Sequence, residues 1–301
     1  MKSSFFDKRW GVFNHFLYGS PGGVNEYRKL CPDWNRRTEE LDVEKLADQL
    51  HKMGAQYYFI TLMQGRKYML APNDTFDRIA GTKPGDACSR RDVIADLIAA
   101  LDPYGIDLCL YFTGDGPYKD EEIGQRFGFL EPRMNVSMAF VKRWAAVLEE
   151  YSLRYGDKVK AWWIDGCYDY FGYNRELLDV YHRAAQAGNK WAAVAFNNGV
   201  KPEINAWGGS DFTTGEFNDF TYLPRAPFVD GAKAHILAPL GIMLDGKPGG
   251  AWCCPGAKRD HAYMKDYIDR VNRAGGLVTV DLYLEPDGTF DPVQMEALTG
   301  I

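Results

Sequence analysis

Several common signatures are missing from this 301-residue sequence, and each absence removes a class of function. The formal net charge is -6, with acidic and basic residues interleaved and no basic patch, so we expect no nucleic-acid partner. No apolar run reaches the roughly 18 residues of a membrane-spanning helix, and the N-terminus lacks a signal-peptide core. We therefore expect no membrane association and a cytoplasmic location, or a periplasmic or secreted one if a leader has been removed.

Motifs for metal, cofactor and serine-nucleophile chemistry are also missing. The six cysteines form no C-x-x-C pair, and the five histidines form no H-x-x-x-H or H-E-x-x-H pattern, so no metal site is predicted. The sequence contains no G-x-G-x-x-G motif after its first strand, no P-loop and no G-x-S-x-G elbow. We expect a protein that works without a cofactor.

The sequence does contain a regular alternation of apolar strands and amphipathic helices. Strand patterns occupy residues 10–16, 56–62, 106–112, 159–165, 191–196, 209–216, 235–244 and 277–284. Helix patterns occupy residues 43–53, 92–101, 136–155, 175–187 and 259–274, with a short one after Pro292, whereas residues 72–85 are expected to form a loop. About eight such units predict an α/β fold, a (β/α)8 TIM-like barrel, in one domain over residues 1–301.

One stretch breaks the alternation. No clear helix lies between Glu216 and Ala234, so we expect the barrel to be irregular between its sixth and seventh strands.

The stretch Trp162-Trp163-Ile164-Asp165-Gly166 is the most informative in the chain. Catalytic groups of parallel barrels lie at the carboxyl ends of the strands, where the pattern places Asp165. Because sugar rings stack on aromatic side chains, we interpret Asp165 as the nucleophile of a retaining glycoside hydrolase and Trp163 as a substrate contact. The alternatives are that Asp165 only caps the next helix and that Trp163 belongs to the core.

Five stretches occur in order along the chain: residues 10–16, 163–166, 196–199, 211–216 and 275–289. Together, over residues 10–298, they resemble the α-L-fucosidases of glycoside hydrolase family 29. The resemblance implies that Asp165 is the nucleophile, that Glu216 is the general acid/base and that His15 binds the sugar. Asp211, Asp219 and Glu285 remain reserve candidates for the acid. The implied activity is that of a retaining exo-glycoside hydrolase with a glycoside substrate.

Other polar and aromatic residues at predicted strand ends are candidates for lining the sugar pocket. Tyr111 ends the third strand, Asn198 follows the fifth, and Trp252 stands in a glycine-rich loop after the seventh. Each is equally compatible with a packing role.

The sequence also departs from the family pattern. The family usually has two adjacent histidines after its second strand, where this chain has Gln64 and Gly65, and Asp281 stands where the family often has asparagine. Gln64 can still bind a sugar hydroxyl, whereas Gly65 offers no side chain. The chain leaves no room for the family's C-terminal β-sandwich, and the barrel face that this exposes suggests a homo-oligomer.

Two other functions fit the same residues. The first is a non-catalytic carbohydrate-binding protein on the same barrel, which the missing histidine pair favours. The second is a barrel lyase or isomerase that uses Asp165 as a general base.

Overall fold

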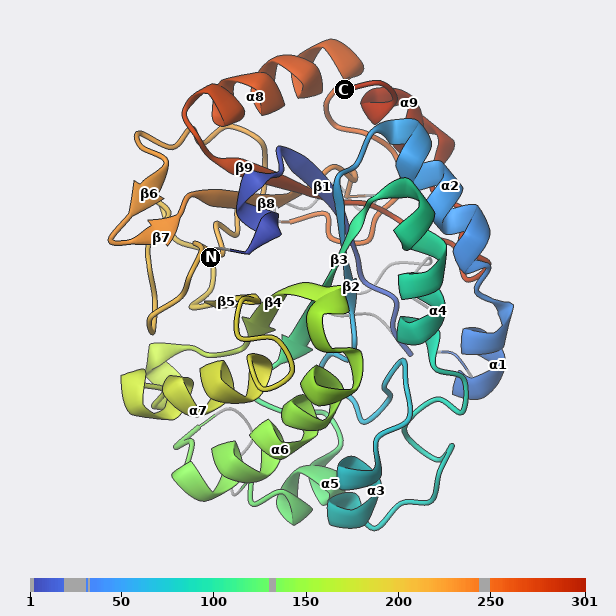
Figure 1. Ribbon diagram of the computed structural model, residues 1–301, viewed down its shortest axis with the longest axis vertical. Helices are drawn as coiled ribbons and strands as arrows, with labels where there is room; N and C mark the ends of the chain where they lie inside the picture. Colours follow the sequence, from blue (N-terminus) through green and yellow to red (C-terminus); the bar gives the residue numbers. More distant parts are fainter. Residues whose placement is uncertain (1–2, 19–30, 32, 130–133, 244–249) are drawn as a thin grey trace.

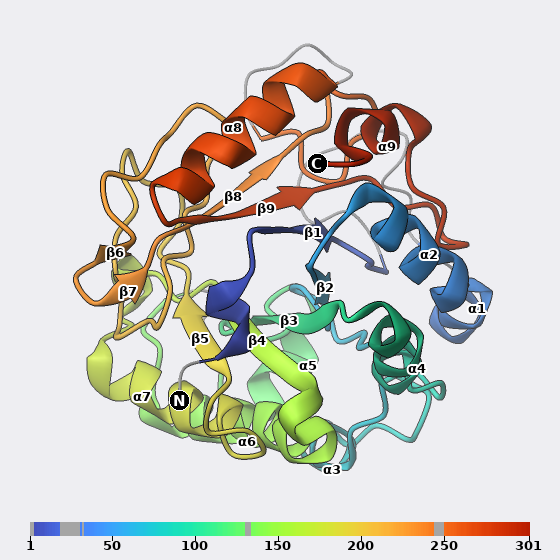
Figure 2. The same cartoon turned by 45° about the horizontal axis from the view of Figure 1, so that its top comes forward.

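A computed structural model describes residues 3–18, 31, 33–129, 134–243 and 250–301. Seven parallel strands form one curved sheet in the order β5-β4-β3-β2-β1-β9-β8 (Figure 1). Their bounds are Trp10–Asn14 (β1), Tyr57–Thr61 (β2), Asp107–Thr113 (β3), Val159–Asp165 (β4), Ala193–Phe196 (β5), His235–Pro239 (β8) and Leu277–Asp281 (β9). The strands enclose a central core and the helices lie outside them (Figure 2), so the predicted TIM-like barrel is confirmed.

Residues 211–217 close the gap between the two edge strands of this sheet. The amide of Asp211 donates to the carbonyl of Val194 in β5 at 2.7 Å, and the amide of Phe217 donates to the carbonyl of Leu237 in β8 at 2.9 Å. Isolated parallel bridges to β8 and to the short strand before it mark the same alignment. This closing segment therefore takes the place of the predicted sixth strand.

Six helices correspond to the helix patterns of the sequence. They are α2 (Val43–Met53), α4 (Val93–Leu101), α6 (Met138–Tyr155), α7 (Arg175–Ala185), α8 (His261–Arg273) and α9 (Pro292–Leu298). The stretch after the closing segment contains only the short antiparallel strands β6 (Phe228–Val229) and β7 (Ala232–Lys233). The predicted irregularity before the seventh barrel strand is thus confirmed (Figure 2).

Three short helices were not predicted: α1 (Trp34–Glu40), α3 (Asp74–Ala80) and α5 (Glu121–Arg126). The expectation of a loop over residues 72–85 was wrong because the Asn73 side chain accepts a hydrogen bond from the Phe76 amide and starts α3 there. The expected extension of α7 to residue 187 was also wrong, since the helix ends at Ala185 with Gln186 as its C-cap. Gly188 allows close packing, because a Cβ there would lie 1.8 Å from the Ser152 carbonyl oxygen.

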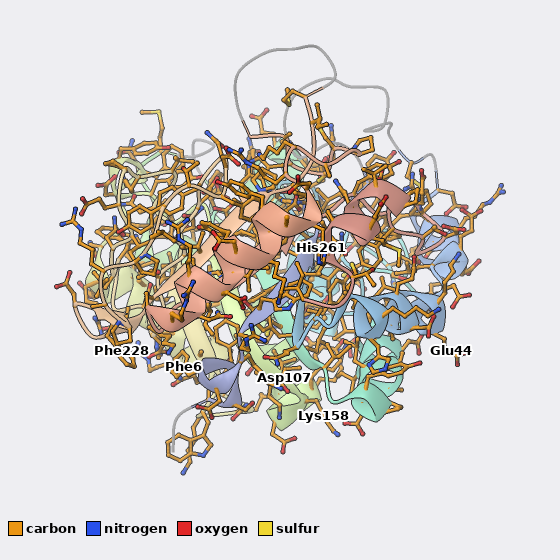
Figure 3. All side chains as sticks on the ribbon, turned by 90° about the horizontal axis from the view of Figure 1, so that it is seen from above. Phe6, Glu44, Asp107, Lys158, Phe228 and His261 are labelled. Atoms are coloured by element: carbon orange, nitrogen blue, oxygen red, sulfur yellow. The ribbon has the colours of Figure 1, made fainter. Side chains whose placement is uncertain are left out.

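Side chains alternate between two cores, as strand geometry requires. Trp162 packs in the large outer core between sheet and helices, whereas Trp163 packs inside the barrel. Phe5, in the 3-10 helix Ser4–Asp7, fills the N-terminal end of the barrel interior. The centroid of its ring lies 4.9 Å from that of the Tyr57 ring. Figure 3 labels the neighbouring Phe6 at this end of the molecule. A candidate active site is therefore expected at the opposite end of the barrel, at the carboxyl ends of the strands.

Candidate active site

Two carboxylates meet at the carboxyl end of the barrel. Asp165 is the last residue of β4, and Glu216 lies in the closing segment, in a bridge with Leu237 of β8. Both side chains are partly buried. Although they are fifty positions apart in sequence, the parallel strands bring them to the same rim, as the sequence predicted.

Asn197, directly after β5, connects the two carboxylates. Its Nδ2 donates to Oδ1 of Asp165 at 2.7 Å and to Oε2 of Glu216 at 2.5 Å. Its Oδ1 accepts the amide of Gly199 at 3.1 Å, which fixes the orientation of the amide group. The two Nδ2 distances limit the separation of these two oxygens, Oδ1 of Asp165 and Oε2 of Glu216, to at most about 5.2 Å.

Tyr111 holds the second oxygen of Asp165. The phenol donates to Oδ2 of Asp165 at 2.5 Å from the neighbouring strand β3. Burial, together with the negative charge of Asp165, raises the pKa of Tyr111 well above its usual value, so the phenol keeps its proton near neutral pH. Asp165 thus accepts one hydrogen bond on each of its two oxygens.

The surroundings of Glu216 raise its pKa. Burial raises its pKa to about 7, and the negative charge of Asp165 acts in the same direction. The hydrogen bond from Asn197 opposes the shift by stabilising the carboxylate. A carboxyl group whose pKa is raised to about 7 keeps much of its proton at neutral pH, as a general acid requires.

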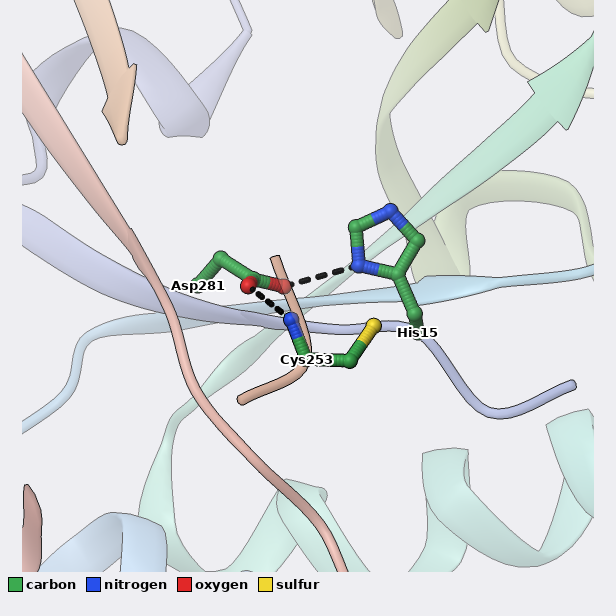
Figure 4. A group of neighbouring side chains, drawn as sticks. All are labelled: His15, Cys253 and Asp281. Carbon is green, nitrogen blue, oxygen red and sulfur yellow. Dashed lines mark hydrogen bonds and ion pairs between the residues drawn. The ribbon is translucent and has the colours of Figure 1, made fainter. Parts of the chain in front are cut away.

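His15 and Asp281, which lie at the carboxyl ends of β1 and β9, form a pair that Figure 4 shows together with Cys253. Nδ1 of His15 lies 2.8 Å from Oδ1 of Asp281, whose Oδ2 accepts the amide of Cys253 at 2.9 Å. The ring centroid of His15 is 6.2 Å from that of Tyr111 and 5.9 Å from that of Trp252. His15 and Trp252 therefore stand together on the rim near Tyr111.

His15, Cys253 and Asp281 also offer one possible metal-ligand atom each, all within 4.8 Å of one another. The direct hydrogen bond between His15 and Asp281 accounts for this proximity without an ion.

The remaining candidates, Trp163, Gln64 and Asn198, lie at the same end of the barrel. Trp163 is 2% exposed and lies two residues before Asp165, in the interior core beneath the carboxylates. Gln64 follows β2 at the same end of the barrel, and its buried Oε1 makes no hydrogen bond within the described residues. Asn198 accepts the amide of Asp169 with its Oδ1 at 3.0 Å, which fastens the loop after β4.

Sequence reasoning selected Asn198 and missed Asn197, although a signal was available. Strand side chains alternate, and the small residues Ala193 and Ala195 face the barrel interior. The next residue on that face is Asn197. A strict count of the alternation identifies it as the pocket-facing amide.

The reserve acids lie away from the carboxylate pair. Asp211 accepts the amide of Val194 and pairs with His182, and Asp219 forms an ion pair with Arg259. Glu285 is exposed. Within the described residues, Glu216 is the acid that shares a hydrogen-bond donor with Asp165.

No protein-family model and no curated protein sequence matches this chain. Solved structures do. An α-L-fucosidase of family GH29 from Bacteroides thetaiotaomicron aligns over 98% of this chain and 71% of its own, with 19% identity and a TM-score of 0.65. The endo-fucoidan hydrolase MfFcnA4 of glycoside hydrolase family 107 aligns over 99% of this chain and 53% of its own, with 16% identity and a TM-score of 0.71.

The Thermotoga maritima α-fucosidase aligns over 100% of this chain and 73% of its own, with 18% identity and a TM-score of 0.61. The chain thus spans about half the length of the fucoidan hydrolase. At these identities the likeness establishes the fold: the chain has the barrel fold that these fucosidases and fucoidan hydrolases share, as the sequence resemblance implied. Among the described residues, no helix has the length and apolar character to cross a membrane.

Proposed function

We propose that this protein is a retaining glycoside hydrolase in which Asp165 is the nucleophile and Glu216 the general acid/base. The observation that carries the proposal is the shared donor, Asn197, which keeps Oδ1 of Asp165 and Oε2 of Glu216 no more than about 5.2 Å apart. Retaining enzymes hold their two carboxyl groups about 5–5.5 Å apart, whereas inverting enzymes need about 6.5–9.5 Å to admit a water. The upper limit for these two oxygens lies below the inverting range, which supports direct attack by Asp165.

In the first step, an oxygen of Asp165 attacks the anomeric carbon of the bound sugar. The bond to the leaving oxygen breaks, and Glu216 gives its proton to that oxygen. A pKa of about 7 keeps a large fraction of Glu216 protonated at neutral pH, as this role requires. The sugar remains as an ester on Asp165.

In the second step, the ionised Glu216 takes a proton from water while that water attacks the anomeric carbon. The ester bond breaks and Asp165 leaves as a carboxylate. Asn197 contacts both carboxylates and keeps them in register through both steps. The two inversions restore the original configuration of the sugar.

The fold neighbours support this chemistry. The Bacteroides thetaiotaomicron fucosidase is known as a trapped covalent intermediate formed with 2-fluoro-fucosyl fluoride. We propose an exo-acting, α-L-fucosidase-like enzyme with an altered sugar pocket. Gly65 stands where the family pattern has a histidine, its φ is +69°, and a Cβ there would lie 3.0 Å from the Tyr118 ring. The backbone at this point thus has little room for a side chain.

The test is hydrolysis of a panel of aryl α- and β-glycosides, including the α-L-fucoside, by the wild type, Asp165→Asn and Asp169→Asn. Asp169 is the matched control, because it is an exposed carboxylate four residues further along the same loop. We expect one glycoside to be turned over, with a loss on the order of 10³-fold or more in Asp165→Asn and little change in Asp169→Asn. A 2-fluoro glycosyl fluoride should add its sugar to the peptide that contains Asp165.

Turnover that survives in Asp165→Asn would remove Asp165 from the nucleophile role. Turnover without an adduct would favour a barrel enzyme that uses Asp165 as a base. If a folded protein turns over no glycoside but a free sugar raises its melting temperature, the protein is a carbohydrate-binding one instead.

A further inference from the structure

We propose that Asp281 sets the hydrogen-bond polarity of His15, so that Nε2 of His15 accepts a hydrogen bond from a substrate hydroxyl rather than donating one. The site would then select a sugar with a free hydroxyl at that position. The inference deepens the proposed function and rests on it for the presence of a sugar. Its central claim, the protonation of one ring nitrogen, can be measured without any substrate.

The partners of Asp281 decide where the proton of His15 lies. Asp281 is 1% exposed at the end of β9, and its two oxygens face Nδ1 of His15 at 2.8 Å and the amide of Cys253 at 2.9 Å. An ionised carboxylate has only acceptors. The proton in the contact with His15 therefore belongs to Nδ1.

The protonation of Nδ1 also determines the state of the other ring nitrogen, Nε2. A neutral imidazole carries one N–H, so Nε2 has a free lone pair when Nδ1 is protonated. Within the described residues Nε2 makes no hydrogen bond, and in Figure 4 it points away from Asp281 and Cys253. The ring stands edge-on to Phe13 and Trp252 and near Tyr111, the residue that binds Asp165. A sugar held at Asp165 thus meets an acceptor at this point.

An accepting Nε2 on His15 distinguishes a free hydroxyl on the sugar from a substituted one. A hydroxyl can donate its proton to Nε2, whereas a methyl ether or a sulfate ester has only acceptor oxygens and would face the lone pair without a proton between them. A buried acceptor left unpaired costs more than a missing contact, so the discrimination is strong where the pocket is closed to water. Asp281 is therefore a positioning residue that determines specificity through His15.

The variant Asp281→Asn should reverse the polarity while keeping the size of the side chain. The amide of Cys253 still needs an acceptor, so the asparagine oxygen faces Cys253 and its NH2 group faces His15. Nδ1 of His15 must then accept, and the proton moves to Nε2. The same ring becomes a donor toward the pocket.

The decisive measurement is the ¹H–¹⁵N correlation spectrum of the histidine rings at a pH where they are neutral. The signals of His15 are assigned by their loss in His15→Gln. We expect the proton on Nδ1 in the wild type and on Nε2 in Asp281→Asn. Asp211→Asn is the matched control, because it changes the carboxylate that pairs with another histidine, His182, and should leave His15 unchanged. A wild-type ring protonated at Nε2, or an unchanged tautomer in Asp281→Asn, overturns the proposal.

A second measurement uses the aryl glycoside that the wild type hydrolyses, with each hydroxyl methylated in turn. At one position the methyl ether should raise KM about tenfold, with little change in kcat, and Asp281→Asn should lose this discrimination. Equal KM values at every position in the wild type would overturn the specificity role. If no glycoside is hydrolysed, the proposed function fails, while the spectra still decide the polarity of His15.

Discussion

Asn197 is the side chain through which the two carboxylates of the site are linked. It donates to both Asp165 and Glu216, and its hydrogen bond lowers the pKa of Glu216 against the effect of burial. The residue type alone does not predict this role, because the neighbouring Asn198 is also an asparagine and only accepts the amide of Asp169 in the loop after β4. The difference between the two lies only in the face of the strand end on which each one stands.

Replacing Asn197 by alanine should change both the rate and its pH dependence. Loss of two hydrogen bonds to carboxyl groups should lower kcat/KM by about 10- to 100-fold. Because the pKa of Glu216 is then no longer held down by Asn197, the basic limb of the pH profile, near pH 7 in the wild type, should move to higher pH. Asn198→Ala is the control and should leave the limb in place. A limb that does not move in Asn197→Ala would contradict the assignment of Glu216 as the acid.

Glu216→Gln should stabilise the folded protein at alkaline pH. The folded state holds the Glu216 proton up to about pH 7, whereas the group ordinarily loses it near 4.5, so the wild type loses stability as the pH rises through this window. Glutamine has no such proton, and the variant should gain about 1–3 kcal/mol at pH 8 and almost nothing at pH 4. Urea unfolding at both pH values measures the difference. A gain of equal size at both would show that ionisation is not its cause.

The closing segment is the element that positions Glu216, and Gly215 is its tightest point. Gly215 has a φ of +55°, and a Cβ there would lie 1.9 Å from the carbonyl oxygen of His235. Alanine must therefore push the segment away from β8 and move the next residue, Glu216. We expect Gly215→Ala to lose most activity and more than about 2 kcal/mol of stability.

The control for this substitution is Gly231→Ala. Gly231 has a φ of +86°, but a Cβ there would meet nothing within 4 Å. Only the backbone strain of about 1–2 kcal/mol remains, and the carboxylates are unaffected. Equal activity losses in the two variants would exclude the close approach to His235 as the cause. Steady-state kinetics and urea unfolding of both proteins provide the comparison.

Among the helices and strands, the sequence predicted the long ones best. The residue ranges of β4 and α2 were predicted without error, because an apolar run and a clear helical period define them. The seven-residue helix α3 was missed, since its start depends on one side-chain cap at Asn73. The closing segment was recognised only as a short strand and loop. The contacts to β5 here include those made by the side chains of Asp211 and of the preceding residue, Ser210, which carry no strand periodicity.

Across the whole molecule, Phe5 ties the first residues of the chain to the centre of the barrel. The ring is fully buried and contacts Tyr57, Phe59 and Phe212 at centroid distances of 4.9, 5.9 and 5.0 Å. Phe5→Ala should therefore lower the free energy of unfolding by about 3–5 kcal/mol. Phe6→Ala is the matched control, since Phe6 is only partly buried and should cost much less. Similar losses in both variants would contradict the central role of Phe5.

The fold as a whole was predictable, whereas the fine structure of the site was not. Alternating strands and helices identify a barrel, and its rim brings Asp165 and Glu216 together. Their spacing, the shared amide and the pairing of His15 with Asp281 depend on side-chain contacts between strands that are distant in sequence. The strand alternation shows which way Asn197 faces, but no local pattern encodes which side chains it contacts.

Phe5 and its neighbours fill the N-terminal end of the barrel interior, and Asp165 and Glu216 lie at the carboxyl end. In the proposed reaction, we therefore expect the departing aglycone and the incoming water to pass through the carboxyl end, one after the other. Any alcohol waiting there competes with water for the sugar on Asp165. The proposed enzyme should thus make glycosidic bonds as well as break them, and added methanol should divert part of the product into methyl glycoside with the configuration of the substrate.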